Sequence, residues 1–156
     1  MTRAHVGAVP FDVLSLDDAI ALVLAQAQRL ADAQQSGSTT PRGVAVHFCN
    51  AYHVALASSD PELAQLLDAG DLVLCDGVPV AWAGRRAYPD LAHRWERVYG
   101  PDVMRGVLAR STPEGPAHYL LGSTPETLAA LTEQIAREYP KARIVGTDAP
   151  PFHAPT

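Results

Sequence analysis

Lysine, cysteine and long apolar runs are scarce in this chain, and each scarcity excludes a class of protein. The two cysteines, Cys49 and Cys75, cannot build a disulfide framework, and both lie in apolar runs where buried reduced thiols are usual. No apolar run approaches the ~18 residues of a membrane-spanning helix, and the N-terminus lacks the apolar core of a signal peptide. We therefore expect a cytoplasmic protein without a membrane span, although attachment to a membrane surface stays open.

Positive charge is also scarce, and the common catalytic motifs are absent from the sequence. With one lysine, the chain has twelve basic residues against seventeen acidic ones, and its formal net charge of -5 gives no general affinity for nucleic acid. The sequence has no Asp-x-Asp pair, no Gly-x-Ser-x-Gly elbow and no Gly-x-Gly-x-x-Gly fingerprint. His47, Cys49 and His53 lack a fourth ligand and the spacing of structural zinc, so we predict no metal site.

Short apolar segments alternate with helical patterns along the chain. An extended segment is expected over 6–13 with a turn at Pro10, strands over 43–48, 71–75, 117–121 and 143–146, and helices from Ser15, Asn50, Asp60, Val78, Pro101 and Pro125. A polar loop is expected over 34–42. Because nearly every strand is continuously apolar, the pattern predicts an α/β fold, a Rossmann-like parallel sheet with helices on both faces. We see no repeat, and expect a single domain over residues 1–156.

Asp76 is the leading candidate for a catalytic group. It directly follows a predicted buried strand, at the carboxyl end where open parallel sheets bind their ligands. Gly77 beside it removes a side chain that would block a ligand, and a carboxylate there can accept the proton of an attacking hydroxyl. The alternative is that Asp76 caps the helix that starts at Val78, and the sequence leaves both open.

Two further strand ends carry polar residues. Asn50 follows the strand 43–48 and could orient a sugar or a base through its amide, although the local pattern favours a helix N-cap. Gly122, Ser123 and Thr124 follow the strand 117–121 and open a helix, where backbone N–H groups and the helix dipole suit a phosphate. Thr124 as N-cap before Pro125 explains the same pattern equally well.

A basic segment stands out in this acidic chain. Between residues 85 and 110 lie six of the twelve basic residues: Arg85, Arg86, Arg94, Arg97, Arg105 and Arg110. Such a segment indicates an anionic ligand, a diphosphate or acidic lipid headgroups, although a solvated face with ion pairs explains most of these arginines. Arg97 differs, because it lies in the compact run 96–102 (ERVYGPD), which is typical of an ordered loop.

Six groups of segments follow one another in an order typical of one enzyme family. They are 7–19 (GAVPFDVLSLDDA), 48–57 (FCNAYHVALA) with 60–63 (DPEL), 71–83 (DLVLCDGVPVAWA), 96–104 (ERVYGPDVM), 119–122 (YLLG) with 125–126 (PE), and 143–146 (RIVG). By these segments the chain resembles the WecG/TagA/CpsF glycosyltransferases (glycosyltransferase family 26) over essentially its whole length.

The resemblance implies a reaction and roles for residues. The reaction is inverting transfer of a sugar (N-acetylmannosamine-type, its uronic acid, or a hexose) from a UDP-sugar to a polyprenyl-diphosphate-linked acceptor in cell-surface polysaccharide or teichoic acid synthesis. Asp76 matches the family's proposed general base, Arg97 its active-site arginine, and Asn50 the residue that closes its Asn-Ala strand. No cofactor is implied besides the donor substrate, which agrees with the missing Asp-x-Asp pair. The expected location is the inner face of the plasma membrane.

Two departures from the family pattern bear on these expectations. Phe48 stands where some members carry a threonine, so a hydroxyl contact there would be lost. The family also continues beyond residue 156 with further strands, helices and a basic appendage for the membrane, so we expect the fold to be incomplete at the C-terminus. An unfinished sheet edge favours a homo-oligomer. The alternative function is a truncated, non-catalytic nucleotide- or partner-binding module. An unrelated α/β epimerase or phosphatase would need a dinucleotide fingerprint or an Asp-x-Asp nucleophile motif, and the sequence has neither.

Overall fold

The fold was obtained as a computed structural model, which describes residues 2–37 and 42–151. It divides the chain into two compact units, Met1–Arg105 and Gly106–Thr156, and each is described by itself. Residues 38–41 of the expected polar loop, and residues 152–156, lie outside the described part. The elements confirm an α/β fold in which short parallel strands alternate with helices. The expectation of one glycosyltransferase-like domain stays a prediction.

The first unit begins with an antiparallel hairpin of β1 (Arg3–Val6) and β2 (Val9–Asp12). The predicted turn at Pro10 is wrong, because Gly7 (φ +60°) and Ala8 make the turn and Pro10 lies within β2. A glycine with positive φ at the first central position suits a tight two-residue hairpin turn. Pro10 is tolerated there because its pair with His5 is a non-hydrogen-bonded pair of the ladder, so β1 needs no N–H from residue 10. On the outer side of β1, the N–H and C=O of His5 bond the Tyr88 hydroxyl (3.2 and 3.1 Å).

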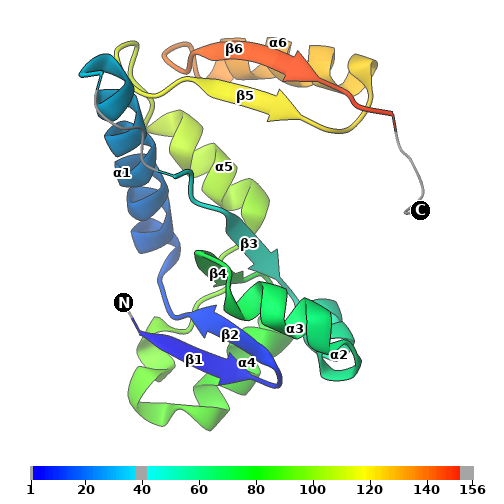
Figure 1. The fold of residues 1–156 in the computed structure, drawn as a ribbon. Coiled ribbons are helices and arrows are strands. Elements are labelled where there is room, and N and C mark those ends of the chain that lie inside the picture. Colours follow the sequence, from blue (N-terminus) through cyan, green and yellow to red (C-terminus); the bar gives the residue numbers. More distant parts are fainter. Residues whose placement is uncertain (1, 38–41, 152–156) are drawn as a thin grey trace. The chain divides into compact units, whose positions relative to one another are not determined.

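A parallel pair follows, formed by β3 (Val46–Cys49) and β4 (Leu72–Cys75). Two helices connect these strands, α2 (Ala51–Ser59) and α3 (Pro61–Asp68), as Figure 1 shows. Asp60 caps α3 through bonds from two backbone N–H groups, with Pro61 in the first turn, which confirms the helix start expected from the sequence. All four residues of β4 are buried, as expected for a strand covered on both faces.

The remaining elements of the first unit are helical. They are α1 (Leu16–Gln35), which Ser15 caps as expected, α4 (Val78–Ala87), the 3-10 helix η1 (Pro89–Arg94) and α5 (Gly100–Ala109), whose C-terminal part extends into the second unit. The segment between α4 and α5 therefore contains a short 3-10 helix. Helix α4 packs against η1 and β1.

Trp95 is the largest side chain in the core of the first unit and is 1% exposed. Its ring meets Phe11 edge-on with centroids 6.0 Å apart and stacks on Tyr88 at 6.3 Å. Gly84 of α4 lies against the indole so closely that a Cβ at this position would come within 2.4 Å of the ring. The absence of a side chain at residue 84 therefore lets α4 approach the core.

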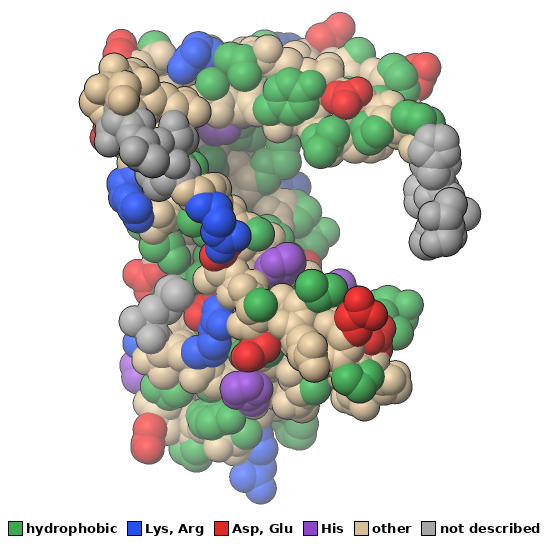
Figure 2. All heavy atoms as spheres, in the orientation of Figure 1, with side chains coloured by type: hydrophobic (Ala, Val, Ile, Leu, Met, Phe, Trp, Pro, Cys, Tyr) green, Lys and Arg blue, Asp and Glu red, His purple; other side chains and the backbone are tan. Residues whose placement is uncertain are grey.

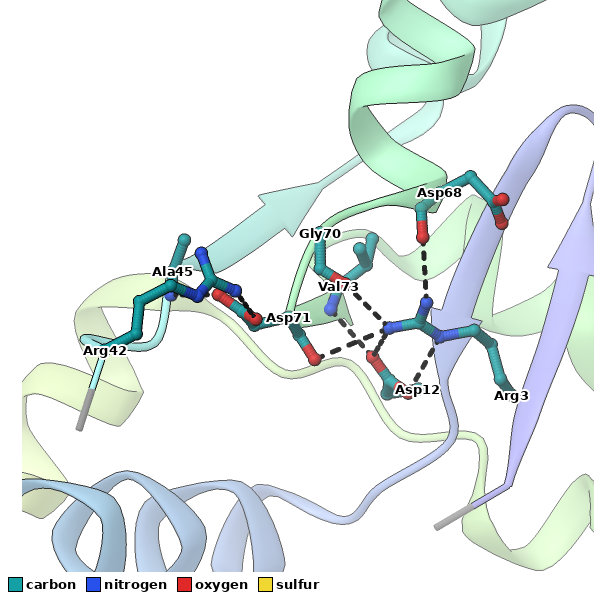
Figure 3. Close-up of polar contacts among 8 residues, drawn as sticks. All are labelled: Arg3, Asp12, Arg42, Ala45, Asp68, Gly70, Asp71 and Val73. Carbon is teal, nitrogen blue, oxygen red and sulfur yellow. Dashed lines mark hydrogen bonds and ion pairs between the residues drawn. The ribbon is translucent and has the colours of Figure 1, made fainter. Parts of the chain in front are cut away.

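A polar cluster ties the hairpin to the beginning of β4 (Figure 3). The carboxylate of Asp12, 3% exposed, accepts two bonds from Arg3 (3.1 and 3.0 Å) and one from the backbone N–H of Val73 (2.9 Å). The Arg3 guanidinium also donates to the backbone carbonyls of Asp68 and Gly70. These charge-assisted hydrogen bonds compensate the buried negative charge of Asp12. They also connect the β1–β2 hairpin to β4, 61 residues further along the chain.

The second unit contains β5 (His118–Leu121), α6 (Pro125–Glu138) and β6 (Ile144–Asp148). The strands pair in parallel, and α6 contacts β6. Burial alternates along both strands, so that Tyr119, Leu121 and Val145 are 59%, 71% and 57% exposed. These strands therefore differ from β4, which is buried throughout.

The two cysteines occupy equivalent positions at the ends of neighbouring strands. Cys49 and Cys75 are partners in the β3–β4 register and are free and buried, as expected. Burial, together with the nearby charge of Asp76, raises the pKa of each thiol to about 11. The thiolates that react with alkylating agents are therefore scarce near neutral pH.

Native protein should resist alkylation at pH 8, because a pKa near 11 leaves only about one thiol in a thousand ionised. Iodoacetamide labelling followed by mass spectrometry tests this expectation. Both cysteines should react in urea and neither in buffer over the same period. Native labelling as fast as that of an unstructured cysteine peptide would contradict it.

The helices and one face of the surface bear on contacts with membranes and nucleic acids. Within the described ranges, none of the helices combines the length and hydropathy that crossing a bilayer requires. Figure 2 shows acidic and basic side chains interspersed on the face drawn, in agreement with the modest negative net charge of -5. A continuous basic stripe, which nucleic-acid recognition requires, is not seen on that face.

Candidate active site

The candidate site of the first unit lies at the carboxyl ends of β3 and β4. Because Cys49 and Cys75 are in register, Asn50 and Asp76 leave the two strands at the same edge, and Asp76 N–H donates to the Cys49 carbonyl (2.9 Å). A third segment joins this edge, since Val98 N–H donates to the Cys75 carbonyl (2.7 Å). The structure thus brings Asn50 and Asp76 together, as the sequence predicts for neighbouring parallel strands, and adds the segment of Arg97. Gly122, Ser123 and Thr124, the third predicted strand end, belong to the second unit.

Asp76 does not cap the helix that follows it. The N-cap residue of α4 is Gly77, and no side chain of the described residues caps this helix. The Asp76 carboxylate is half-buried and accepts no hydrogen bond within the part of the chain that the structure describes. The capping alternative is therefore wrong, and both the carboxylate and the first N–H groups of α4 are left for a ligand.

Several charges act on Asp76. Burial raises its pKa above the ordinary aspartate value, and the charge of Asp102 acts in the same direction. The positive charge of Arg97 opposes this and lowers the pKa, and a protonated His53 would act in the same direction. A carboxylate whose pKa is raised is a stronger proton acceptor in its ionised form.

Asn50 has a structural role that the sequence favoured. Its side-chain oxygen accepts from Tyr52 N–H (2.9 Å) and caps α2, and Nδ1 of His53 completes a capping box with the Asn50 backbone N–H (3.3 Å). The amide NH2 group of Asn50 keeps its donors, for which no partner occurs among the described residues. Capping and sugar binding are therefore compatible at this residue.

Gly77 lies directly over Asn50. A Cβ at residue 77 would lie 3.4 Å from the Cβ of Asn50, an ordinary contact, and the φ of -179° is extended backbone open to any residue. Neither strain nor overlap therefore requires glycine here. Its effect is that no side chain of residue 77 covers Asn50.

Phe48 occupies the position at which some members of the family that the chain resembles carry threonine. A Cβ at Gly100, the first residue of α5, would lie 3.5 Å from the Phe48 ring. The ring thus packs beside the Arg97 segment rather than offering a hydroxyl to a ligand. We infer that any polar contact at this point comes from another residue.

The other arginines of the basic segment are partly used within the protein. Arg85 donates to the Trp95 carbonyl (2.7 Å), and Arg105 pairs with Asp102 (2.9 Å). Arg97 is exposed and lies over the Tyr99 ring, with its guanidinium carbon 4.1 Å from the centroid. Of the six, Arg97 is the one whose charge lowers the pKa of Asp76.

The predicted phosphate loop, residues 122–124, belongs to the second unit. Gly122 and Ser123 have positive φ values (107° and 64°), and Thr124 caps α6 by accepting from Thr127 N–H (3.3 Å). The pKa of Glu126 is lowered by a bond from its own backbone N–H and by the Thr124 hydroxyl, so a carboxylate already holds the anion-accepting start of this helix. Substrate binding by Gly122, Ser123 and Thr124 stays a prediction.

Sequence reasoning assigned no role in this site to three residues: His53, Tyr99 and Asp102. A signal existed for two of them. His53 lies three residues after Asn50, the spacing of a capping box, although histidine replaces the usual Glu or Gln. Tyr99 and Arg97 flank a single apolar residue, Val98, which places them on the same side of an extended segment.

Neither a metal-ligand cluster nor the cavity beside α1 belongs to this arrangement in the part of the chain that the structure describes. Within the described ranges there is no cluster of three or more His, Cys, Asp or Glu side chains able to hold a metal ion. A cavity of about 430 Å³ lies at the opposite, amino-terminal ends of β3 and β4, where its lining includes Leu22, Leu30, Val46 and Leu72. It therefore does not belong to the Asp76 site.

A comparison with protein families identifies the family of the chain. Residues 4–156 match the family model described as "Glycosyl transferase WecG/TagA/CpsF family". The match includes the strand ends and the loop with Asp76, Arg97 and Asn50. The chain therefore belongs to the WecG/TagA/CpsF family of glycosyltransferases, enzymes of cell-surface polymer synthesis that act on a sugar-nucleotide donor and an acceptor.

Proposed function

We propose that the protein is a metal-independent, inverting hexosyltransferase. It moves an N-acetylmannosamine-type sugar, the corresponding uronic acid or a hexose from a UDP-sugar to a polyprenyl-diphosphate-linked amino sugar. The observation that supports this most is Asp76, a half-buried carboxylate at the tip of β4 with no hydrogen bond among the described residues and a raised pKa. It works at the inner face of the plasma membrane, where such an acceptor is held.

The reaction is a single displacement at the anomeric carbon. The acceptor hydroxyl gives its proton to the Asp76 carboxylate as its oxygen forms the new glycosidic bond. The bond between the anomeric carbon and the diphosphate breaks, and UDP leaves with the electron pair. Arg97 and the uncapped N–H groups of α4 stabilise the negative charge that develops on the diphosphate. The NH2 group of Asn50 orients the sugar.

The proposal is tested by incubating the protein with a UDP-sugar and a lipid-linked GlcNAc diphosphate. UDP release that requires both substrates and persists in EDTA is the expected result, with the new disaccharide confirmed by mass spectrometry. Calorimetry with UDP accompanies the assay. UDP binding without turnover would favour the alternative, a non-catalytic nucleotide-binding module, and the absence of both would contradict each function.

The pH dependence of kcat/KM should shift in opposite directions in two variants. Arg97→Gln removes a charge that lowers the pKa of Asp76, so the acid limb should move to higher pH. Asp102→Asn removes a charge that raises this pKa, so the limb should move to lower pH. The measurement is a pH profile of UDP release for the parent and both variants. Shifts of the same sign would show that Asp76 does not set the limb.

A further inference from the structure

Among the described residues, the ring of Tyr99 is the group that the Arg97 side chain contacts directly. The guanidinium carbon lies 4.1 Å from the ring centroid, within the range of a cation–π contact. The described ion pairs join other residues: Arg3 with Asp12, Arg42 with Asp71 and Arg105 with Asp102. Arg97 is exposed, and Tyr99 is half-buried. The ring is therefore the better fixed member of the pair.

The backbone holds this pair beside Asp76. Val98, between the two residues, is 1% exposed, and its N–H donates to the carbonyl of Cys75, the residue before Asp76 (2.7 Å). The carbonyl of Tyr99 accepts from the N–H groups of Asp102 and Val103 (3.0 Å each) at the start of α5. With Val98 turned into the core, its two neighbours leave the backbone on the outer side, where their side chains meet.

Stacking suits an arginine that must also bind an anion. A guanidinium offers a flat face to an aromatic ring, while its N–H donors lie in the plane and point outward at the edge. A carboxylate partner would occupy those donors, whereas a ring leaves them available to two oxygens of a diphosphate. The contact thus restrains a long, flexible side chain without competing with the ligand.

We propose that Tyr99 is a positioning residue whose ring holds the Arg97 guanidinium edge-on to the diphosphate of the nucleotide sugar. The inference rests on the proposed function. It also explains how an exposed arginine keeps its charge close to Asp76. The ring, and not the hydroxyl, performs this role, so phenylalanine should replace tyrosine.

The test compares Tyr99→Phe and Tyr99→Leu with the parent. Tyr99→Leu should raise the Kd for UDP and the KM for the UDP-sugar by about 2- to 30-fold, the range expected from losing a cation–π contact. It should also move the acid limb of the pH profile upward, as Arg97→Gln does, because the arginine charge is no longer held near Asp76. Tyr99→Phe should keep all three values near those of the parent.

A double-mutant cycle shows whether Tyr99 acts through Arg97. In the Arg97→Gln background, Tyr99→Leu should change the Kd for UDP by less than about 2-fold, because the interaction is already lost. Equal effects in both backgrounds would assign the ring a merely structural role and overturn the inference. Unfolding midpoints accompany each measurement. Should Tyr99→Leu unfold, Arg97→Lys tests the same contact, since lysine keeps the charge without a flat face and should raise the Kd.

The two proposals fail in different ways. A parent that binds UDP and turns over, with Tyr99→Leu unchanged from it, overturns the positioning role and leaves the glycosyltransferase function intact. A parent that neither binds UDP nor releases it overturns both. Loss of binding in Tyr99→Phe as well as in Tyr99→Leu would assign the effect to the hydroxyl and overturn the stacking argument alone.

Discussion

Replacing Asp76 by asparagine should lower kcat by about 10²- to 10⁴-fold, the contribution typical of a positioned general base. Asparagine keeps the size of the side chain but cannot take a proton from the acceptor hydroxyl. UDP should bind the variant as it binds the parent, because the diphosphate contacts come from Arg97 and the start of α4. The measurements are steady-state UDP release and calorimetry with UDP.

The same substitution should not destabilise the protein. Since the folded protein raises the pKa of Asp76, the ionised carboxylate is less favourable there than in the unfolded chain, and this cost grows as pH rises through the ordinary aspartate pKa. Asparagine removes that cost, so the unfolding midpoint at pH 8 should equal or exceed that of the parent. Activity and stability changing in opposite directions is typical of a functional residue.

Asp90→Asn is the matched control for Asp76. It removes an exposed carboxylate of η1 and should change neither kcat nor the unfolding midpoint. Turnover by Asp76→Asn within a few-fold of the parent would remove Asp76 as the base. A large loss of UDP affinity together with unchanged kcat would instead assign Asp76 to substrate binding.

Arg3→Leu should be among the most destabilising single changes in the first unit. It leaves Asp12, 3% exposed, as a buried carboxylate whose remaining partner in Figure 3 is the Val73 N–H (2.9 Å). Removing one member of a buried ion pair costs about 3–5 kcal/mol, a large part of the ~5–15 kcal/mol by which domains are stable. Urea unfolding with an unchanged m-value measures the loss.

Two variants make this expectation specific. Asp12→Asn keeps an oxygen for the Val73 N–H and leaves no buried charge, so it should cost less than Arg3→Leu. Arg42→Leu breaks the pair with Asp71 nearby, in which the arginine side chain is 77% exposed, and should cost under ~1 kcal/mol. Equal losses for Arg3→Leu and Arg42→Leu would show that burial of Asp12 does not determine the effect.

Much of the fold could be predicted because its signals are local. The cap at Ser15, the cap and proline at Asp60-Pro61, and the apolar run of β4 each lie within a few residues of the element they define. The hairpin turn was placed wrongly because Pro10 is a strong local turn signal. Pro10 fits within β2 because the register pairs it with His5 at a non-hydrogen-bonded position, where the missing N–H costs nothing.

The candidate site also combines features that the sequence predicts with features that depend on contacts between distant segments. Asn50 and Asp76 could be placed at one edge because parallel strands share their carboxyl ends. The sequence could not decide whether Asp76 is a general base or a helix cap. An aspartate between a strand and a helix is compatible with both roles. The roles of Tyr99 and His53 depend on contacts with the ends of β4 and β3, such as the bond from Val98 to Cys75. No spacing rule in the sequence reports such contacts.

The contact between Gly84 and Trp95 has a consequence for how this protein can evolve or be redesigned. With a Cβ at residue 84 only 2.4 Å from the indole, the two positions share one fixed volume. An alanine at 84 becomes acceptable only when residue 95 is smaller, so neither position is free to vary alone. Libraries and ancestral reconstructions should therefore treat 84 and 95 as a single coupled site.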